Sequence, residues 1–177
     1  MKEIIVKPYQ SPCGELLLGS FGDGLCLCDW TGGKRHEWQT GHIMTALQAD
    51  FRSGDSAVLD TATRQLDEYF DRRRTAFDIP LIFTGTDFQN KVWNILRTVP
   101  YGTTLSYRRL AEKVGDPKAT RAVAGANAVN PLSVFVPCHR IIGSDNKLVG
   151  DGGGLAAKSA LLETEGIILF GASAIYV

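Results

Sequence analysis

The sequence predicts an α/β protein of the α+β kind, with a small antiparallel sheet and helices first and a mostly helical second domain. Three observations predict this fold: short apolar runs broken by turn residues over 3–30, helical periodicity over 57–74, and two short helices joined by a glycine turn in the second half. A stretch punctuated by Pro and Gly, residues 78–85, separates the two parts. We therefore place the domains at 1–85 and 86–177.

Composition and charge restrict the class of protein. Hydrophobic residues make up 44% of the chain and charged residues 21%, which is enough apolar material for a packed core. The 19 basic and 19 acidic residues cancel, but from Thr86 onward ten basic residues stand against seven acidic ones, a local excess of +3. This excess permits a local nucleic-acid-binding patch and argues against a strongly basic protein that coats DNA.

The sequence also predicts the cellular compartment of the protein. No apolar run approaches the roughly 18 residues that a membrane helix needs, and the first seven residues alternate charged and apolar groups. The four cysteines are too unevenly spaced to suggest a disulfide framework. We therefore expect a cytoplasmic protein with no membrane contact and with reduced thiols.

In the first domain, apolar runs at Ile4–Val6, Leu16–Leu18 and Leu25–Leu27 predict an antiparallel meander. A helix is predicted from Ala57 to Arg74, with three arginines at its end, where cations suit the helix dipole. The basic triplet is interpreted as a solvated helix end, with nucleic-acid contact as the alternative.

In the second domain, Thr86 and Gln89 form a capping box that predicts a helix ending before Pro100, with Trp93 in the core. Ser106 is expected to cap a short helix that ends at Gly115. Asp116 and Pro117 are then expected to open a helix over 118–128, which completes a helix-turn-helix. The small residues of this last helix allow close approach to another helix or to a nucleic-acid groove.

Cys138 is the candidate nucleophile. An apolar segment over 130–137, which looks extended, leads into Cys138-His139-Arg140. A buried cysteine is ordinarily inert, but nearby cations favour the reactive thiolate. Neighbours on a regular strand point to opposite faces, so His139 can deprotonate Cys138 only if the chain bends or a water bridges the two. Glu165, after the helical stretch 156–164, could orient His139 or be a solvated helix end.

From about Ala57 to Gly166 the chain resembles the O6-alkylguanine-DNA alkyltransferases, the methylated-DNA–protein-cysteine methyltransferase family. The tetrapeptide Pro137-Cys138-His139-Arg140 is similar to their active-site signature. Further matches occur in family order at Gln65-Leu66-x-x-Tyr69-Phe70, Phe88-Gln89-x-x-Val92-Trp93, Val99-Pro100-Tyr101-Gly102, Ser106-Tyr107, Arg121-Ala122-Val123, Asn130-Pro131, Gly153-Gly154-Leu155 and Leu161-Leu162-x-x-Glu165-Gly166.

The resemblance implies a ribonuclease-H-like first domain, a winged-helix-like second domain and DNA repair without a cofactor. A monomer would bind double-stranded DNA carrying O6-alkylguanine through the minor groove and flip the base. It would pass the alkyl group irreversibly to Cys138, and the sequence leaves open whether O4-alkylthymine is also a substrate. His139 would take the thiol proton through water, Glu165 would orient His139, and Asn130 would brace the turn.

The resemblance also implies two sets of binding residues. Tyr107 would rotate the target phosphate, Arg121 would fill the space left by the flipped base, and three small residues would allow close approach to the groove, namely Ala122, Gly125 and Ala126. The base pocket is expected to contain Val136, Pro137, Ser144, Asp151, Gly152 and Gly153.

Asp151 is a departure from the family, which usually has a tyrosine at this position. A carboxylate cannot reproduce the donor role of a phenol unless it is protonated. We therefore expect weaker base binding or an altered substrate range.

Three other functions are compatible with parts of the sequence. A binder of alkylated DNA without efficient transfer would follow if Asp151 impairs the pocket. A thiol hydrolase would use Cys138, His139 and Glu165 as a triad, although no oxyanion loop is evident. A zinc site would have to use residues of the first domain, namely Cys13, Cys26, Cys28, His36 and His42, and the Cys26-x-Cys28 spacing is too tight for the common zinc knuckle.

Overall fold

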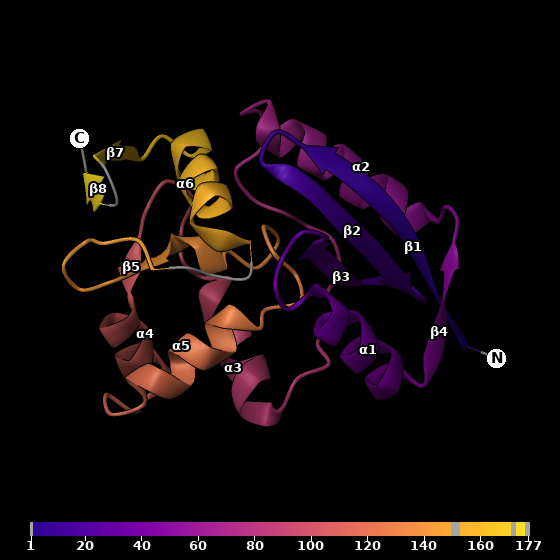
Figure 1. Ribbon diagram of the computed structural model, residues 1–177, viewed down its shortest axis with the longest axis horizontal. Coiled ribbons are helices and arrows are strands. Elements are labelled where there is room, and N and C mark those ends of the chain that lie inside the picture. The colour runs from indigo at the N-terminus through magenta and orange to yellow at the C-terminus, as the bar shows by residue number, and fades with distance from the viewer. Residues whose placement is uncertain (1, 150–152, 171–172, 176–177) are drawn as a thin grey trace. The chain divides into compact units, whose positions relative to one another are not determined.

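The computed structural model describes residues 2–149, 153–170 and 173–175 of the chain, in two compact units (Figure 1). Unit 1 comprises Met1–Thr84 and unit 2 comprises Gly85–Val177. Unit 1 contains a sheet with two helices, and unit 2 is mostly helical. The predicted α+β fold, with the sheet first and the helical part second, is confirmed.

The sheet of unit 1 begins as the predicted antiparallel meander. Strands β1 (Lys2–Ser11), β2 (Gly14–Phe21) and β3 (Gly24–Trp30) pair in antiparallel fashion. The tight β2–β3 turn places Gly22 at φ +56°, a conformation that favours glycine. A fourth strand, β4 (Ala49–Ser53), pairs parallel to β1, so the sheet is mixed with the order β3-β2-β1-β4. The sequence did not indicate β4, because five residues with two apolar side chains are too few for a clear pattern.

Helices cover both faces of this sheet. Helix α1 (His36–Leu47) packs against β3 and β4, and its Ile43 belongs to a core cluster that also contacts Leu17 of β2. Leu16 and Leu18 point to the opposite face and are fully buried, and helix α2 (Ala57–Phe70) packs against β1, β2 and β3. The periodicity of the sequence did not predict α1, because the apolar residues of this helix do not form a single stripe.

The predicted end of α2 was wrong. The helix stops at Phe70, because Arg72 adopts φ +60° and leaves the helical conformation. Within the residues that follow, Arg73 pairs with Asp71 and Arg74 pairs with Glu68. The basic triplet therefore follows the helix, and its last two arginines contact carboxylates of their own unit.

Unit 2 opens with helix α3 (Asp87–Leu96), which has the predicted capping box between Thr86 and Gln89. Trp93 is a core residue as predicted, 2% exposed, and its indole N–H donates to the carbonyl of Ala126 at 2.9 Å. This hydrogen bond joins α3 to the second helix of the helix-turn-helix.

The helix-turn-helix consists of α4 (Tyr107–Val114) and α5 (Thr120–Ala128). Ser106 caps α4, and Gly115 ends it at φ +101°, both as predicted. The predicted start of α5 was wrong: the Asp116 side chain accepts from the backbone N–H of Lys118, so it closes a turn and the helix begins later. Helices α3, α4 and α5 pack against one another (Figure 1).

The rest of unit 2 joins short strands to one helix. Strands β5 (Leu105–Ser106) and β6 (Ile141–Ile142) form a parallel pair, and helix α6 (Gly154–Thr164) follows. Strands β7 (Ile168–Phe170) and β8 (Ser173–Ile175) form an antiparallel pair near the C-terminus. The pair β5–β6 places the chain just after Cys138 beside the start of α4.

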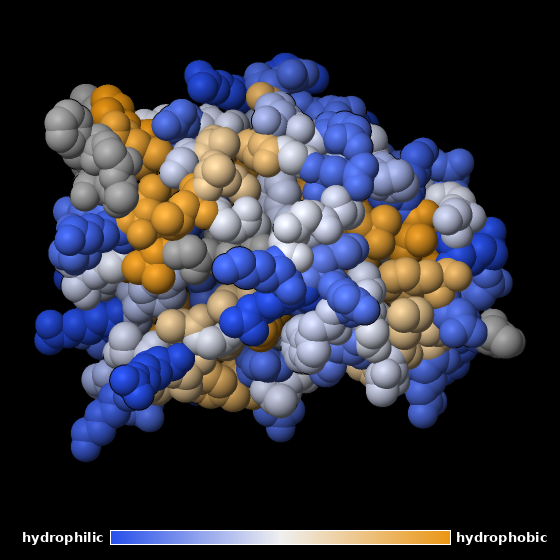
Figure 2. Space-filling view, in the orientation of Figure 1, coloured by the Kyte–Doolittle hydropathy of each residue, from blue (hydrophilic) through white to orange (hydrophobic). Residues whose placement is uncertain are grey.

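Hydrophilic residues cover most of the face drawn in Figure 2, and the hydrophobic areas on it are separate from one another. Among the described residues, no helix is both long and apolar enough to cross a membrane.

The packing around Gly85 predicts a destabilising substitution. A Cβ at this position would lie 2.5 Å from the indole ring of Trp93, which is buried and cannot move aside. We expect Gly85→Ala to lower the free energy of unfolding by about 1–3 kcal/mol, measured by urea denaturation.

The matched control is Gly41→Ala on α1, where a new Cβ meets no atom within 4 Å. We expect this change to raise the stability by roughly 0.5–1 kcal/mol, because alanine favours a helix over glycine. Equal effects of the two substitutions would show that the contact with Trp93 is not decisive.

Candidate active site

The turn before Cys138 differs from the extended segment that the sequence predicted. Val134 adopts φ +72°, and the backbone N–H of Val136 donates to the carbonyl of Leu132 at 2.8 Å, so the chain folds back on itself. Asn130 closes this turn from both sides: its amide donates to the Val136 carbonyl at 2.8 Å, and its oxygen accepts from the Leu132 N–H at 3.0 Å. All residues from 131 to 140 are buried, and satisfied backbone groups make this tight turn tolerable.

The bend that the sequence left open lies directly at Cys138. Residues Cys138–Arg140 form one turn of 3₁₀-helix, so Cys138 and His139 do not point to opposite faces as they would on a strand. Cys138 is 4% exposed and His139 is fully buried. The thiol and the imidazole are therefore presented from one compact turn.

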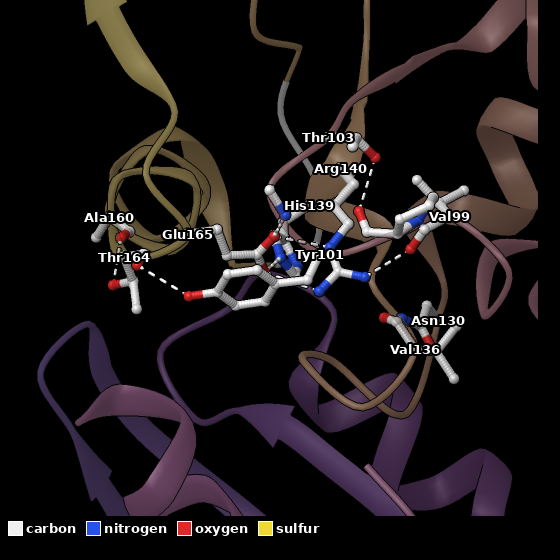
Figure 3. Close-up of polar contacts among 12 residues, drawn as sticks. Val99, Tyr101, Thr103, Asn130, Val136, His139, Arg140, Ala160, Thr164 and Glu165 are labelled. Atoms are coloured by element: carbon white, nitrogen blue, oxygen red, sulfur yellow. Dashed lines mark hydrogen bonds and ion pairs between the residues drawn. The ribbon is translucent and has the colours of Figure 1, made fainter. Parts of the chain in front are cut away.

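Glu165, directly after α6, is at the centre of a buried polar network (Figure 3). Its Oε2 lies 2.6 Å from Nε2 of His139. Arg140 donates from Nε to Oε1 at 2.8 Å and from Nη2 to Oε2 at 3.0 Å, and the backbone N–H of Gly102 donates to Oε1 at 3.1 Å. The structure thus brings together the three residues that the sequence suggested as a group, with Arg140 as an additional ion-pair partner.

Arg140 is itself held in place by the segment before α4. Its Nη1 donates to the carbonyl of Val99 at 2.7 Å, and its guanidinium lies 5.8 Å from the ring centroid of Tyr101. The hydroxyl of Tyr101 donates to the carbonyl of Thr164 at 3.2 Å. The planar guanidinium therefore orients both carboxylate oxygens of Glu165.

The charges in this network have a clear direction. Burial alone would raise the pKa of Glu165, but the hydrogen bonds and charges of His139 and Arg140 outweigh it and hold that pKa well below its ordinary value. Glu165 is therefore a carboxylate, which only accepts hydrogen bonds, so Nε2 of His139 carries the shared proton. The other ring nitrogen, Nδ1, is buried and has no hydrogen-bond partner within the described part of the chain. In the neutral imidazole this nitrogen has the lone pair that can take a proton.

Lys158 was not identified from the sequence. It is fully buried on α6, and its ammonium donates to the carbonyl of Ile141 and, at 2.8 Å, to the carbonyl of Val149. The same ammonium lies 5.8 Å from the ring centroid of Tyr107. The signal that could have revealed it is a single lysine within an apolar stretch of helix. It connects the strand after the cysteine turn, the loop before Gly150 and the first residue of α4.

The predicted DNA-binding residues are on the helix-turn-helix. Arg121, Ala122 and Gly125 are exposed on α5, and a Cβ on Gly125 would meet no atom within 4 Å. Tyr107 is half-buried at the start of α4. Ala126 lies on the opposite, buried side of α5 at 4% exposure, and this placement excludes its side chain from a surface contact.

The predicted pocket residues are only partly brought together. Val136 and Pro137 are buried in the cysteine turn, and Gly153 lies immediately before the start of α6. Ser144 is exposed and lines a polar cavity of about 370 Å³ together with Ser106 and Arg109. The remaining two, Asp151 and Gly152, lie outside the described residues.

The first-domain residues considered for zinc do not form a metal site in the structure. Cys26 and Cys28 are fully buried in β3, and burial raises the pKa of Cys26 to about 12, which disfavours the thiolate that zinc requires. His36 is bonded through Nδ1 to Asp29 at 2.7 Å. Over the described residues, no group of three or more His, Cys, Asp or Glu side chains is arranged to hold a metal ion.

The comparisons with known families match both units. Residues 4–83 match the 6-O-methylguanine DNA methyltransferase ribonuclease-like domain, and residues 87–167 match the DNA-binding domain of the same family. These matches agree with the fold that the resemblance implied for each part of the chain.

Relatives and solved structures agree with the family models. The methylated-DNA–protein-cysteine methyltransferase of Mycobacterium leprae is 53% identical over 90% of this chain and 90% of its own length, and that of Methanosarcina acetivorans is 39% identical over 89% and 96%. The crystal structure of Mycobacterium tuberculosis OGT in complex with DNA has a TM-score of 0.78 at 38% identity, covering 92% of this chain and 93% of that one. The protein therefore belongs to the methylated-DNA–protein-cysteine methyltransferase family.

Proposed function

We propose that this protein repairs DNA by transferring the alkyl group of O6-alkylguanine directly to the sulfur of Cys138. The observation that carries the proposal is the buried contact between His139 and Glu165, built next to a cysteine on the same 3₁₀ turn, in a chain of this family. The C–O bond of the lesion breaks as an S–C bond forms, and guanine is the leaving group. The proton of the thiol passes to His139 and is finally returned to guanine.

The roles of the charged residues follow from the network. The Glu165 carboxylate fixes the ring of His139 and stabilises the positive charge that appears when His139 takes the thiol proton. His139 and Arg140 together keep Glu165 ionised through their hydrogen bonds to it. Asn130 braces the turn that presents the sulfur. The thioether product has no hydrolytic exit, so each molecule repairs one lesion.

The helix-turn-helix provides the DNA-facing part of the proposal. Exposed Ala122 and Gly125 leave the surface of α5 free of large side chains, which suits close approach to the floor of the minor groove. Arg121 extends from the same surface and would occupy the stack after the base is flipped, while Tyr107 would rotate the phosphate. The proposed partner is double-stranded DNA carrying O6-alkylguanine.

The proposal also covers the location of the protein, its oligomeric state and its need for a cofactor. We place the protein in the cytoplasm, where the thiol of Cys138 stays reduced. It acts as a monomer, because one chain supplies the nucleophile, the polar network and the helix-turn-helix. No cofactor takes part in the proposed chemistry, since the bond to sulfur forms directly.

Intact-protein mass spectrometry tests the proposed function. After incubation with excess duplex containing O6-methylguanine, we expect the protein to gain the mass of one CH₂ group and no more, because the thioether is not released. Cys138→Ala should gain nothing. Cys13→Ala, a matched change at a half-buried cysteine of unit 1, should react like the unchanged protein. A gain in Cys138→Ala, or repeated turnover of the substrate, would refute the proposal.

The Glu165 network predicts a pH-dependent loss of stability. We expect Glu165→Gln to lower the free energy of unfolding by about 3 kcal/mol near pH 7, since it leaves the Arg140 charge buried and uncompensated. The pKa of Glu165 is lower in the folded than in the unfolded chain, so its contribution is complete above the unfolded value of about 4.3 and is lost as the pH falls below it. The difference between the two proteins should therefore be constant from pH 7 to about pH 5 and shrink in more acidic solution.

Urea denaturation across this pH range provides the measurement. The matched control is Glu163→Gln, in the last turn of α6. The side chain of Glu163 is exposed, so this change should have little effect on the stability. If Glu165→Gln proved as stable as the unchanged protein at pH 7, the network would not have the strength that its geometry indicates.

A further inference from the structure

Asn127 is a buried polar residue on α5 that the proposed chemistry does not use. It is 1% exposed and lies on the inner side of the helix, next to Ala126, while Arg121 and Gly125 lie on the exposed side. A helix position facing the core ordinarily holds an apolar side chain. An asparagine here therefore requires a specific reason.

The contacts of Asn127 lead directly to the cysteine. Its amide Nδ2 donates to the backbone carbonyl of Cys138 at 3.4 Å. The same carbonyl accepts the backbone N–H of Ile141, which closes the 3₁₀ turn. Two donors from different elements thus hold one carbonyl, and the orientation of that peptide group sets the directions of the side chains at positions 138 and 139.

The other end of the amide makes no hydrogen bond in the described part of the chain. Oδ1 of Asn127 is buried and has no partner within the described residues, a state that is destabilising compared with a satisfied or apolar group. Leucine has the same branched shape, with methyl groups in place of the two polar atoms, and leaves no buried polar atom without a partner. The residue is therefore better explained by what its Nδ2 does to the cysteine turn than by its contribution to stability.

We propose that Asn127 is a positioning residue for alkyl transfer, which holds the Cys138 carbonyl from α5 and so presents the thiol to His139. This inference rests on the proposed function. In this proposal α5 has two roles. Its face with Arg121 and Gly125 is directed to DNA, and its opposite face supports the turn that contains the nucleophile. The hydrogen bond from Trp93 to Ala126 fixes the same part of α5 against α3, so the support is rigid.

The consequence for catalysis concerns the proton of the thiol. In the proposed mechanism, the held turn keeps the thiol where a bridging water can pass its proton to Nδ1 of His139 at neutral pH. Without the amide, the peptide group of Cys138 is free to rotate, and this placement is lost. Transfer then depends on thiolate formed without assistance, whose fraction rises with pH.

The experiment compares Asn127→Leu and Asn127→Asp with the unchanged protein. The first variant removes both polar atoms, and the second keeps the size of the side chain but removes the Nδ2 donor. The single-turnover rate of methyl transfer from duplex DNA is measured by mass spectrometry from pH 6.5 to pH 9, together with affinity for the undamaged duplex and thermal unfolding. Asn94→Leu, an exposed asparagine on α3, is the matched control.

We expect Asn127→Leu to transfer about 10- to 100-fold more slowly at pH 7, as for a small misplacement of a reacting group, with unchanged affinity for DNA. Its rate should recover toward pH 9, unlike that of the unchanged protein, and Asn127→Asp should also be slow at pH 7. A wild-type rate in Asn127→Leu, or a loss that follows the unfolded fraction with an unaltered pH profile, would overturn the inference. Failure of the unchanged protein to transfer at all would instead refute the proposed function.

Discussion

Glu165 accepts hydrogen bonds from His139, Arg140 and the backbone of Gly102 with its side chain fully buried, and the geometry of the site follows from this carboxylate. A buried carboxylate is tolerated only when it is paired and hydrogen-bonded, and Arg140 supplies both conditions. Because the carboxylate cannot donate, it dictates which nitrogen of His139 has the proton. The segment near Gly102, the 3₁₀ turn and the end of α6 are joined at this one group, so the nucleophile cannot move independently of them.

Unit 2 contains both the proposed DNA-binding surface and the support of the proposed nucleophile. Its helix-turn-helix offers a surface of small residues with Arg121 on the outside, and the inner side of α5 contacts the turn that contains Cys138. Lys158 makes a second connection, between the strand after that turn, the loop before Gly150 and the ring of Tyr107. In the proposed function, DNA docking and thiol presentation therefore depend on the same rigid elements.

Local signals predicted much of the fold. The capping box of Thr86 and Gln89, the cap at Ser106 and the stop at Gly115 depend on neighbouring residues alone, and the structure has all three. The end of α2 and the tight turn at Val134 were not predicted, because each depends on the backbone conformation of a single residue, and the start of α5 was not predicted because the Asp116 side chain closes a turn before it. The approach of Glu165 to His139 was suggested by residue type and family resemblance. The roles of Arg140, Lys158 and Asn127 depend on contacts between distant segments, which periodicity does not report.

The position of the proton on His139 tests this account most directly. Nitrogen NMR of the ¹⁵N-labelled protein distinguishes a protonated ring nitrogen from one with a free lone pair. We expect that in the neutral imidazole the proton is on Nε2, facing Glu165, and that Nδ1 has the lone pair that receives the thiol proton. A neutral His139 with its proton on Nδ1 would contradict it, because the ring could then neither donate to Glu165 nor accept a proton from Cys138.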